Sequence, residues 1–343
     1  MLCVSDVFTT GIWTGLDELL DGDLKELAKD LPQIALDSRS SGTIKNYLTG
    51  FKRWKVWASK YDEINILPTE PKHIALYLTY LTKISKSHTP ISLAFYSLSW
   101  AHRTAGFDDP TNHDLPKMVR ESAVRKLGKG NNKKLPVSSD DIKCIVKKFA
   151  GVNASLLDLR TVCICLLCYS GFLRFDEVAS IKFCDIEIEE THMRLFIEKS
   201  KTDQCREGAW VYISRAYSIA CPVTILERYL SLAVFKKGSE KYLFRAVSYF
   251  RSLGRHKLRP GNSPITYSCA RELILKVFKE VGLESRLFGT HSLRAGGATA
   301  AAENQVPDRL FKKHGRWRSE RVKDGYVKEG LNQLLLVSIN LGL

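Results

Sequence analysis

Hydrophobic positions in the first half of the chain recur at helical spacing. Between residues 41 and 60, Tyr47, Phe51, Trp54 and Ala58 fall on one stripe, while charged side chains occupy the other faces. Three more helical runs follow, at residues 73–84, 90–107 and 114–127. Four helices in fewer than a hundred residues predict a small helical bundle.

The second half combines helices with a few strands. The continuous apolar run at residues 162–169 predicts a buried helix, which Ser170 and Gly171 end. Strand patterns at 185–189, 193–204 and 210–213 predict a small β-sheet. Further helices are predicted at residues 140–150, 156–169, 223–234 and 268–281, whereas 235–264 gives no clear pattern. The fold class is therefore mainly α with a small β-sheet.

Two short helices are predicted near the C-terminus, within residues 289–327. The first is an Ala-rich run with Thr290 as its candidate N-cap. The second begins at Pro307 and ends at Gly315. His291 and Arg294 are three residues apart on the first helix, so they share a face and can reach one anion. A helix N-terminus favours phosphate as well.

The chain is long enough for two domains, because a single core rarely grows beyond about 250–300 residues. Residues 128–139, GKGNNKKLPVSS, have almost no apolar content and predict a basic linker. We therefore expect an acidic appendage at 1–37, a helical domain at 38–127, this linker, and an α+β domain at 140–343 that ends in an apolar helix.

Charge is unevenly distributed along the chain. The formal net charge is +15 and the pI about 9.3, which favours a polyanionic partner, with nucleic acid ranked before a membrane surface. Residues 1–37 contain eight acidic residues and two lysines, a net of −6, so the remainder carries +21. An amphipathic helix is predicted at 16–31, stopped by Pro32. This segment is either a solvated or partner-facing helix or an autoinhibitory mimic of DNA.

Other signals are missing from the sequence. The N-terminus lacks the basic start of a signal peptide, and no apolar run approaches the roughly 18 residues that span a bilayer, so an intracellular location and no membrane partner are expected. The nine cysteines are scattered and odd in number. Cys163, Cys165 and Cys168 lie in the most apolar helix and are interpreted as core residues, because no Cys-x-x-Cys pair or nearby His completes a zinc set.

Several polar residues with the order and spacing of a catalytic set remain. Arg174 and Glu177 stand in a G-x-x-R-x-x-E context, and Lys201 lies at the mouth of the predicted β-hairpin. Trp317 follows Arg294 by twenty-three residues, and Tyr326 follows Trp317 by nine. In this order the set resembles the active site of the tyrosine recombinases. His314 is an alternative for the position of Trp317, although only Trp317 keeps the spacing to the tyrosine.

The resemblance implies a role for each residue. Arg174 and Arg294 would bind the scissile phosphate, Glu177 would orient the site, and Tyr326 would attack phosphorus to form a covalent 3′-phosphotyrosine. Lys201 would protonate the 5′ oxygen, His291 would assist the tyrosine proton, and Trp317 would donate its indole N–H. The sequence has no carboxylate cluster for a metal pair, and energy stored in the covalent link removes the need for ATP, so no metal and no cofactor are expected.

Double-stranded DNA and further copies of the chain are the expected partners. The resemblance implies that residues 38–127 form a core DNA-binding domain and residues 140–343 the catalytic domain, which together clamp a duplex. It also implies a dimer on each site and a tetramer in synapsis. The apolar segment 331–343 would pack either on its own domain or, preferably, on a neighbouring protomer. Candidate DNA-binding residues are Lys45, Lys52, Arg53, Arg103, Lys133 and Lys134.

Two other functions use similar residues. A type IB topoisomerase would act as a monomer, and a domesticated recombinase would bind DNA without cutting it. The filled catalytic positions disfavour the second, and the apolar C-terminus disfavours the first. We therefore predict a DNA recombinase or integrase with features of a eukaryotic mobile element. Its expected location is the nucleus if it is eukaryotic, and otherwise the cytoplasm or nucleoid.

Overall fold

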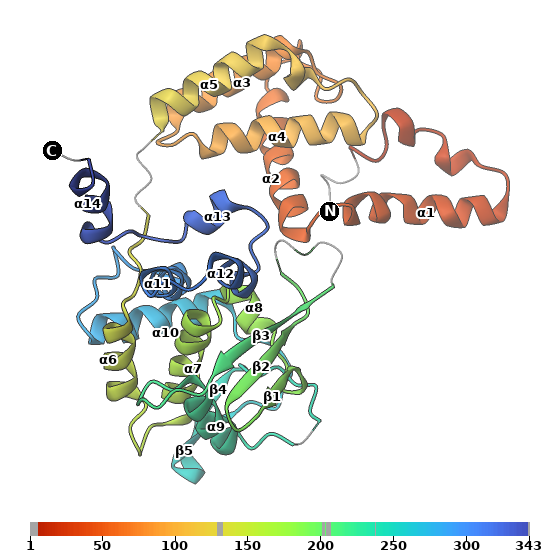
Figure 1. The fold of residues 1–343 in the computed structure, drawn as a ribbon. Helices are drawn as coiled ribbons and strands as arrows, with labels where there is room; N and C mark the ends of the chain where they lie inside the picture. The colour runs from red at the N-terminus through yellow and green to blue at the C-terminus, as the bar shows by residue number, and fades with distance from the viewer. Residues whose placement is uncertain (1–5, 129–132, 201–202, 204–206, 237, 342–343) are drawn as a thin grey trace. The chain divides into compact units, whose positions relative to one another are not determined.

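The computed structural model describes residues 6–128, 133–200, 203, 207–236 and 238–341 (Figure 1). Two compact units make up the chain, Met1–Asn131 and Asn132–Leu343. The boundary between them falls inside the segment 128–139. In the part of the chain that the structure describes, no helix is long and apolar enough to cross a membrane.

The first unit is built around a helical bundle. Its core contains Phe51 and Trp54 from one helix and Leu78 and Leu98 from two others, all fully buried. The side chain of Ser40 caps the first bundle helix by accepting the backbone N–H of Thr43. The bundle consists of α2 (Ser41–Ala58), α3 (Pro71–Ile84), α4 (Thr89–Thr104) and α5 (Asp114–Leu127).

The acidic N-terminal segment forms helix α1 (Gly22–Asp37), and the prediction that Pro32 ends it is wrong. Asp21 caps the helix, which continues through the proline to Asp37. Proline removes one backbone donor, but this helix is exposed, so water can solvate the carbonyl that loses its partner. The apolar side chains of Leu24, Leu27 and Ile34 remain 50%, 64% and 62% exposed.

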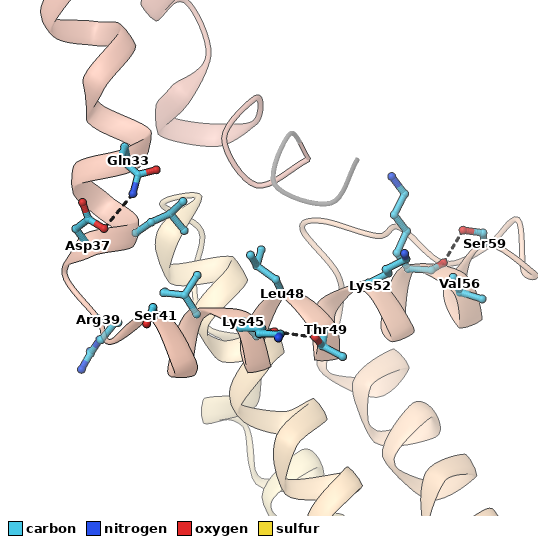
Figure 2. A pocket seen from close by; sticks show the side chains of 13 residues that line it. Gln33, Asp37, Arg39, Ser41, Lys45, Leu48, Thr49, Lys52, Val56 and Ser59 are labelled. Atoms are coloured by element: carbon cyan, nitrogen blue, oxygen red, sulfur yellow. Dashed lines mark hydrogen bonds between the residues drawn. The ribbon is translucent and has the colours of Figure 1, made fainter. Parts of the chain in front are cut away.

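A cavity of about 770 Å³ lies between the end of α1 and the outer face of α2. Ile44, Leu48 and Val56 give it an apolar floor, and Lys45 and Lys52 are among the basic residues that line it. Figure 2 shows these side chains together with the hydrogen bond of 3.0 Å between Gln33 and Asp37 at the end of α1.

The second unit surrounds a central helix, α7, in which Cys163, Cys165 and Cys168 are buried. Burial raises the pKa of the Cys165 thiol to about 12, as expected for core packing. The helices of the unit are α6 (Ser139–Phe149), α7 (Leu156–Ser170), α8 (Phe175–Ser180), α9 (Pro222–Ala233), α10 (Tyr267–Glu280), α11 (Thr290–Glu303), α12 (Asp308–Gly315), α13 (Glu320–Asp324) and α14 (Leu331–Ile339).

A three-stranded antiparallel sheet, in the order β1-β2-β3, packs on this helical core. Its strands are β1 (Ile186–Ile188), β2 (His192–Ile197) and β3 (Ala209–Ser214). Leu195 pairs with Val211, and both point into the core, as the alternation along the strands requires. A separate hairpin of β4 (Val247–Phe250) and β5 (Arg255–Leu258) lies in the region whose sequence gave no pattern.

The apolar side chains of helix α14 whose burial the structure describes are exposed. Leu334 is 59% exposed, Leu336 55% and Ile339 68%. Of the two expected destinations for this segment, packing on its own domain is therefore not what these described residues do.

Candidate active site

The candidate active site is organised around the carboxylate of Glu177, which is 3% exposed. Arg174 precedes α8, and Glu177 lies in the first turn of that helix. One carboxylate oxygen accepts the backbone N–H of Arg174 at 2.8 Å, and the other accepts Nη1 of the same residue at 2.8 Å. The spacing of three residues thus fixes the guanidinium beside the start of the helix.

Arg294 reaches the same carboxylate from α11. Its Nη1 lies 3.6 Å from Oε2 of Glu177, and the side chain is 1% exposed. The guanidinium also donates to the backbone carbonyls of Phe172 and Gly315, the latter at 2.8 Å. These contacts tie together the loop before α8, the helix α11 and the end of α12.

Arg316 is a third member of this cluster, and the sequence interpretation missed it. Its Nη2 donates to Oε2 of Glu177 at 2.8 Å, and its side chain is 9% exposed. The backbone of Arg316 has φ 54°, in the left-handed region, at the C-cap of α12. The available signal was a basic residue placed directly between Gly315 and Trp317.

The cluster holds more positive charge than its carboxylate can neutralise. Three guanidinium groups surround one carboxylate, which leaves an excess of two positive charges. Burial alone would raise the pKa of Glu177, but Arg316, Arg294 and Arg174 hold it below its usual value. Burial and the neighbouring Arg174 lower the pKa of Arg294 to about 10, so it stays charged at neutral pH. Such a site favours a bound anion.

Tyr326 and Trp317 lie against these arginines. The guanidinium carbon of Arg294 is 4.9 Å from the ring centre of Tyr326 and 5.1 Å from that of Trp317. The two aromatic rings are 5.6 Å apart, and Phe311 packs on Trp317 at 5.0 Å. The sequence positions of the arginine, tryptophan and tyrosine therefore meet in one place.

Buried donors in this site have no partner among the described residues. They are the indole Nε1 of Trp317 and the Nε atoms of Arg294 and Arg316. An unpaired buried donor costs on the order of 1–3 kcal/mol, so an incoming acceptor gains by satisfying it. An oxyanion is the acceptor that matches the surrounding charge.

His291 is exposed in the first turn of α11, while Arg294 one turn on is buried. The prediction that Thr290 caps this helix is wrong. Gly289 is the N-cap residue, Thr290 is the first helical residue, and the Ser292 hydroxyl accepts the Gly289 N–H at 3.0 Å. Ser292, the third residue of the helix, thus satisfies the N-cap N–H, as the third residue of a capping box does.

His314, the alternative to Trp317, makes a different contact. Its Nε2 donates to the backbone carbonyl of Ser170 at 2.8 Å, and its ring lies edge-on to Phe172 at 4.7 Å. Burial lowers the pKa of His314, which favours the neutral ring. This geometry favours a structural role for His314 and leaves the ring contact with Tyr326 to Trp317.

The other residues predicted from the sequence are Lys201 and the six candidate DNA-binding residues. Lys201 lies outside the described residues, between β2 and β3. Lys45, Lys52, Arg53 and Arg103 are exposed on the first unit. Lys133 donates to the carbonyl of Gly325 at 3.3 Å, directly before Tyr326, and Lys134 donates to the carbonyl of Arg286. Across the described ranges, no group of three or more His, Cys, Asp or Glu side chains could hold a metal ion.

Comparison with known proteins defines the class. The family model described as the phage integrase family matches residues 137–330. The chain therefore belongs to the phage integrase family, the tyrosine recombinases, and the predicted class of enzyme is confirmed. An "Integrase/recombinase xerD homolog" from Selenomonas ruminantium is 26% identical over 297 residues, covering 85% of this chain and 83% of that protein. The expected origin in a eukaryotic element finds no support in these matches.

Solved structures share the fold at low sequence identity. XerH site-specific recombinase, bound to palindromic difH substrate in a post-cleavage complex, has a TM-score of 0.62 and 15% identity, covering 96% of this chain and 87% of that one. A lambda integrase dimer, residues 75–356 bound to a COC′ core site, has a TM-score of 0.54 and 17% identity, covering 89% and 94%. These likenesses confirm the predicted fold class, mainly α with a small β-sheet.

Proposed function

We propose that this protein is a site-specific recombinase that cleaves and rejoins double-stranded DNA through a 3′-phosphotyrosine on Tyr326. The observation that carries this proposal is the contact of the Tyr326 ring with a buried arginine cluster that has excess positive charge. A nucleophile beside a preorganised anion site is what phosphoryl transfer requires.

In the proposed reaction the Tyr326 oxygen attacks phosphorus, and the bond from phosphorus to the 5′ oxygen breaks. Arg174 and Arg294 bind the non-bridging oxygens and stabilise the charge that develops on them. Arg316 acts as a positioning residue, because its Nη donors go to Glu177 and to backbone carbonyls, whereas Arg294 also lies against the Tyr326 ring. The phosphotyrosine link preserves the bond energy, so attack by a 5′ hydroxyl rejoins a strand without ATP.

The other roles rest on the sequence resemblance together with the geometry of the site. Trp317 would donate its unpartnered indole N–H to the phosphate, and His291 would take the Tyr326 proton. Lys201 would protonate the departing 5′ oxygen. Because arginine charge meets the phosphate, we expect the chemistry to need no metal ion or other cofactor.

Replacing the nucleophile tests this proposal directly. Tyr326→Phe removes one oxygen and should abolish covalent trapping on nicked, randomised duplexes while leaving DNA binding intact. Trapping in the native chain should continue in excess EDTA. Tyr217→Phe, at a fully exposed tyrosine, is the matched control. Protein–DNA adducts from Tyr326→Phe would overturn the assignment, and loss of trapping in EDTA with recovery in magnesium would overturn the metal-free chemistry.

We further propose that the active assembly is a dimer on each site and a tetramer in synapsis, with α14 docked on a neighbouring protomer. The exposed Leu334, Leu336 and Ile339 support this, since an apolar helix is stabilised by burial and ring closure needs head-to-tail contacts. The same feature disfavours a topoisomerase that works as a monomer.

Deletion of residues 330–343 should leave a folded protein that binds DNA but does not pair two duplexes in light scattering. Leu336→Glu should have the same effect with the helix retained, whereas Ser338→Glu, on an exposed polar side chain, should not. A truncated chain that still forms synaptic complexes would refute docking by α14 and would leave the cleavage chemistry untouched.

Six basic residues are proposed to contact the duplex backbone. All six side chains are exposed, and two of them, Lys133 and Lys134, also donate to backbone carbonyls of the second unit. The acidic segment 1–37 should oppose binding, so its removal should tighten it. We propose an intracellular location, and the proposal of a nuclear protein rests on the sequence features alone.

A further inference from the structure

A second concave site lies in the catalytic unit, framed by the hairpin β4–β5, the start of α7 and the end of α9. It has a volume of about 700 Å³. Within this unit, Figure 1 places β5 at the end opposite α12 and α13, which carry or adjoin the active-site residues. The site is therefore separate from the arginine cluster around Glu177.

The residues that line this hairpin pocket are strongly basic. None of them is Asp or Glu. The stretch 235–264, which supplies most of the pocket, contains eight Lys or Arg residues and a single acid, Glu240. The basic lining residues are Lys241, Arg245, Arg255, Lys257 and Arg259, accompanied by His256.

Two arginines at the pocket, the lining residue Arg245 and its neighbour Arg160, are buried without an acidic partner among the described residues. Arg245 is 6% exposed and Arg160 is 2% exposed. Arg245 donates to the backbone carbonyls of Tyr242, Arg259 and Gly261, and Arg160 donates to the carbonyl of Arg245. In the described part of the chain, neither guanidinium has a carboxylate within 4.0 Å. Neutral carbonyls orient these groups but leave their charge uncompensated.

The start of α7 adds to this positive field. Ser155 caps the helix and Leu156 begins it, and both line the pocket. A helix of this length presents partial positive charge at its N-terminus. Asp158 in the first turn is engaged by the Ser155 hydroxyl at 2.8 Å and does not line the pocket.

Exposed aromatic side chains on β4 accompany the basic pocket. Tyr249 is 56% exposed and Phe250 is 37% exposed. Across the hairpin, Tyr249 meets His256 edge-on, with ring centres 5.2 Å apart. A basic surface with aromatic faces is the combination that binds a phosphate backbone and stacks on bases.

We propose that the hairpin pocket is an accessory nucleic-acid site, which binds the phosphodiester backbone of a DNA segment other than the one held at Tyr326. Arg255, Lys257 and Arg259 contact phosphates, and the buried Arg245 supports the turn 259–261 that presents Arg259. This site lies beyond the proposed function, because recombination chemistry needs only the Glu177 cluster and its neighbours. The aromatic pair favours nucleic acid over a free polyphosphate, which would share only the anionic contacts.

Photocrosslinking at position 249 tests the proposal in the full-length chain. With Tyr249 replaced by p-benzoylphenylalanine, irradiation on a short, labelled, mixed-sequence duplex should give a protein–DNA adduct. Combining Arg255→Glu, Lys257→Glu and Arg259→Glu should reduce that adduct by about tenfold or more, since three phosphate contacts are reversed in sign. Lys276→Glu with Lys279→Glu, on the exposed face of α10, is the control for charge reversal. The same crosslinker at the exposed Tyr217 controls for chance collisions.

The outcomes separate this site from the active site. Covalent trapping by Tyr326 should remain in the triple variant. Absence of covalent trapping in the unmodified chain would contradict the proposed function and would leave the accessory site untouched. Tripolyphosphate should compete with the adduct at position 249. No adduct at saturating DNA, an adduct equal to that at position 217, or an adduct that survives the triple substitution would overturn the accessory site. Binding of tripolyphosphate to the pocket, without any DNA adduct, would overturn the nucleic-acid site in favour of a site for a soluble polyphosphate.

Discussion

The second unit gathers arginines in two places, and their surroundings differ. Around Glu177, three guanidinium groups share one buried carboxylate and lie against Tyr326. In the hairpin pocket, Arg160 and Arg245 are also buried, but backbone carbonyls are their hydrogen-bond partners. Positive charge alone therefore does not define the catalytic site.

The carboxylate makes the difference. Glu177 receives Arg174 from its own helix and Arg316 from beyond α12, so it fixes donors from distant segments on one point. Backbone carbonyls at the hairpin pocket orient Arg160 and Arg245 without neutralising their charge. The first arrangement suits a reaction that needs aligned donors, and the second suits the retention of a polyanion.

Removal of the Glu177 carboxylate should have the largest effect on stability and on covalent trapping. Glu177→Gln leaves three arginines buried around a neutral amide, so we expect a loss of about 3–5 kcal/mol of unfolding free energy, together with loss of covalent trapping. Urea unfolding of the full chain measures the first effect. Asp176→Asn, at an exposed carboxylate in the same helix, should change little. Equal stability of the two variants would show that Glu177 does not organise the cluster.

A buried arginine in the hairpin pocket should matter less. Arg245→Met keeps most of the side-chain volume but leaves the carbonyls of Tyr242, Arg259 and Gly261 without their donor, which should cost about 1–3 kcal/mol by urea unfolding. Covalent trapping should be unaffected. Arg255→Met, at an exposed neighbour, provides the control. A loss of trapping in Arg245→Met would mean that the two arginine sites are coupled.

The smallest expected effect is one of pH. Burial lowers the pKa of His314, so the folded state favours the neutral ring that donates to Ser170. The unfolded chain takes up a proton near the ordinary value of about 6.5, so stability from this group is present above that pH. It is lost as the pH falls toward the lower folded value. In urea unfolding, the free energy of unfolding should therefore decline less steeply between about pH 7 and 5 in His314→Gln than in the unmodified chain. This window is set by the ordinary histidine pKa. The buried His102, whose pKa burial also lowers, keeps its own share in both proteins. Equal slopes would exclude His314 as a contributor.

Local patterns predicted the helices of both units and the motif residues. Arg174 and Glu177 lie within one turn, and so do His291 and Arg294, so their spacing carries the information. Arg316 was not predicted as a site residue because its contact with Glu177 joins residues 139 positions apart, and no local period encodes such a pair. The hairpin at residues 247–258 was not predicted because neither β4 nor β5 fully buries one face, so the hydrophobic alternation along the strands is weak. The prediction that Pro32 ends the first helix was wrong because an exposed helix tolerates the loss of one backbone donor.

The left-handed backbone of Arg316 has a consequence for laboratory evolution. A residue other than glycine or asparagine at φ 54° is strained by on the order of 1–3 kcal/mol. Arg316→Gly would relieve that strain at the backbone, yet it also removes a guanidinium from Glu177 and weakens the contacts that hold the other two arginines. A variant library at position 316 should therefore be scored for both heat resistance and strand cleavage, because the backbone conformation favours glycine and the contact with Glu177 requires arginine.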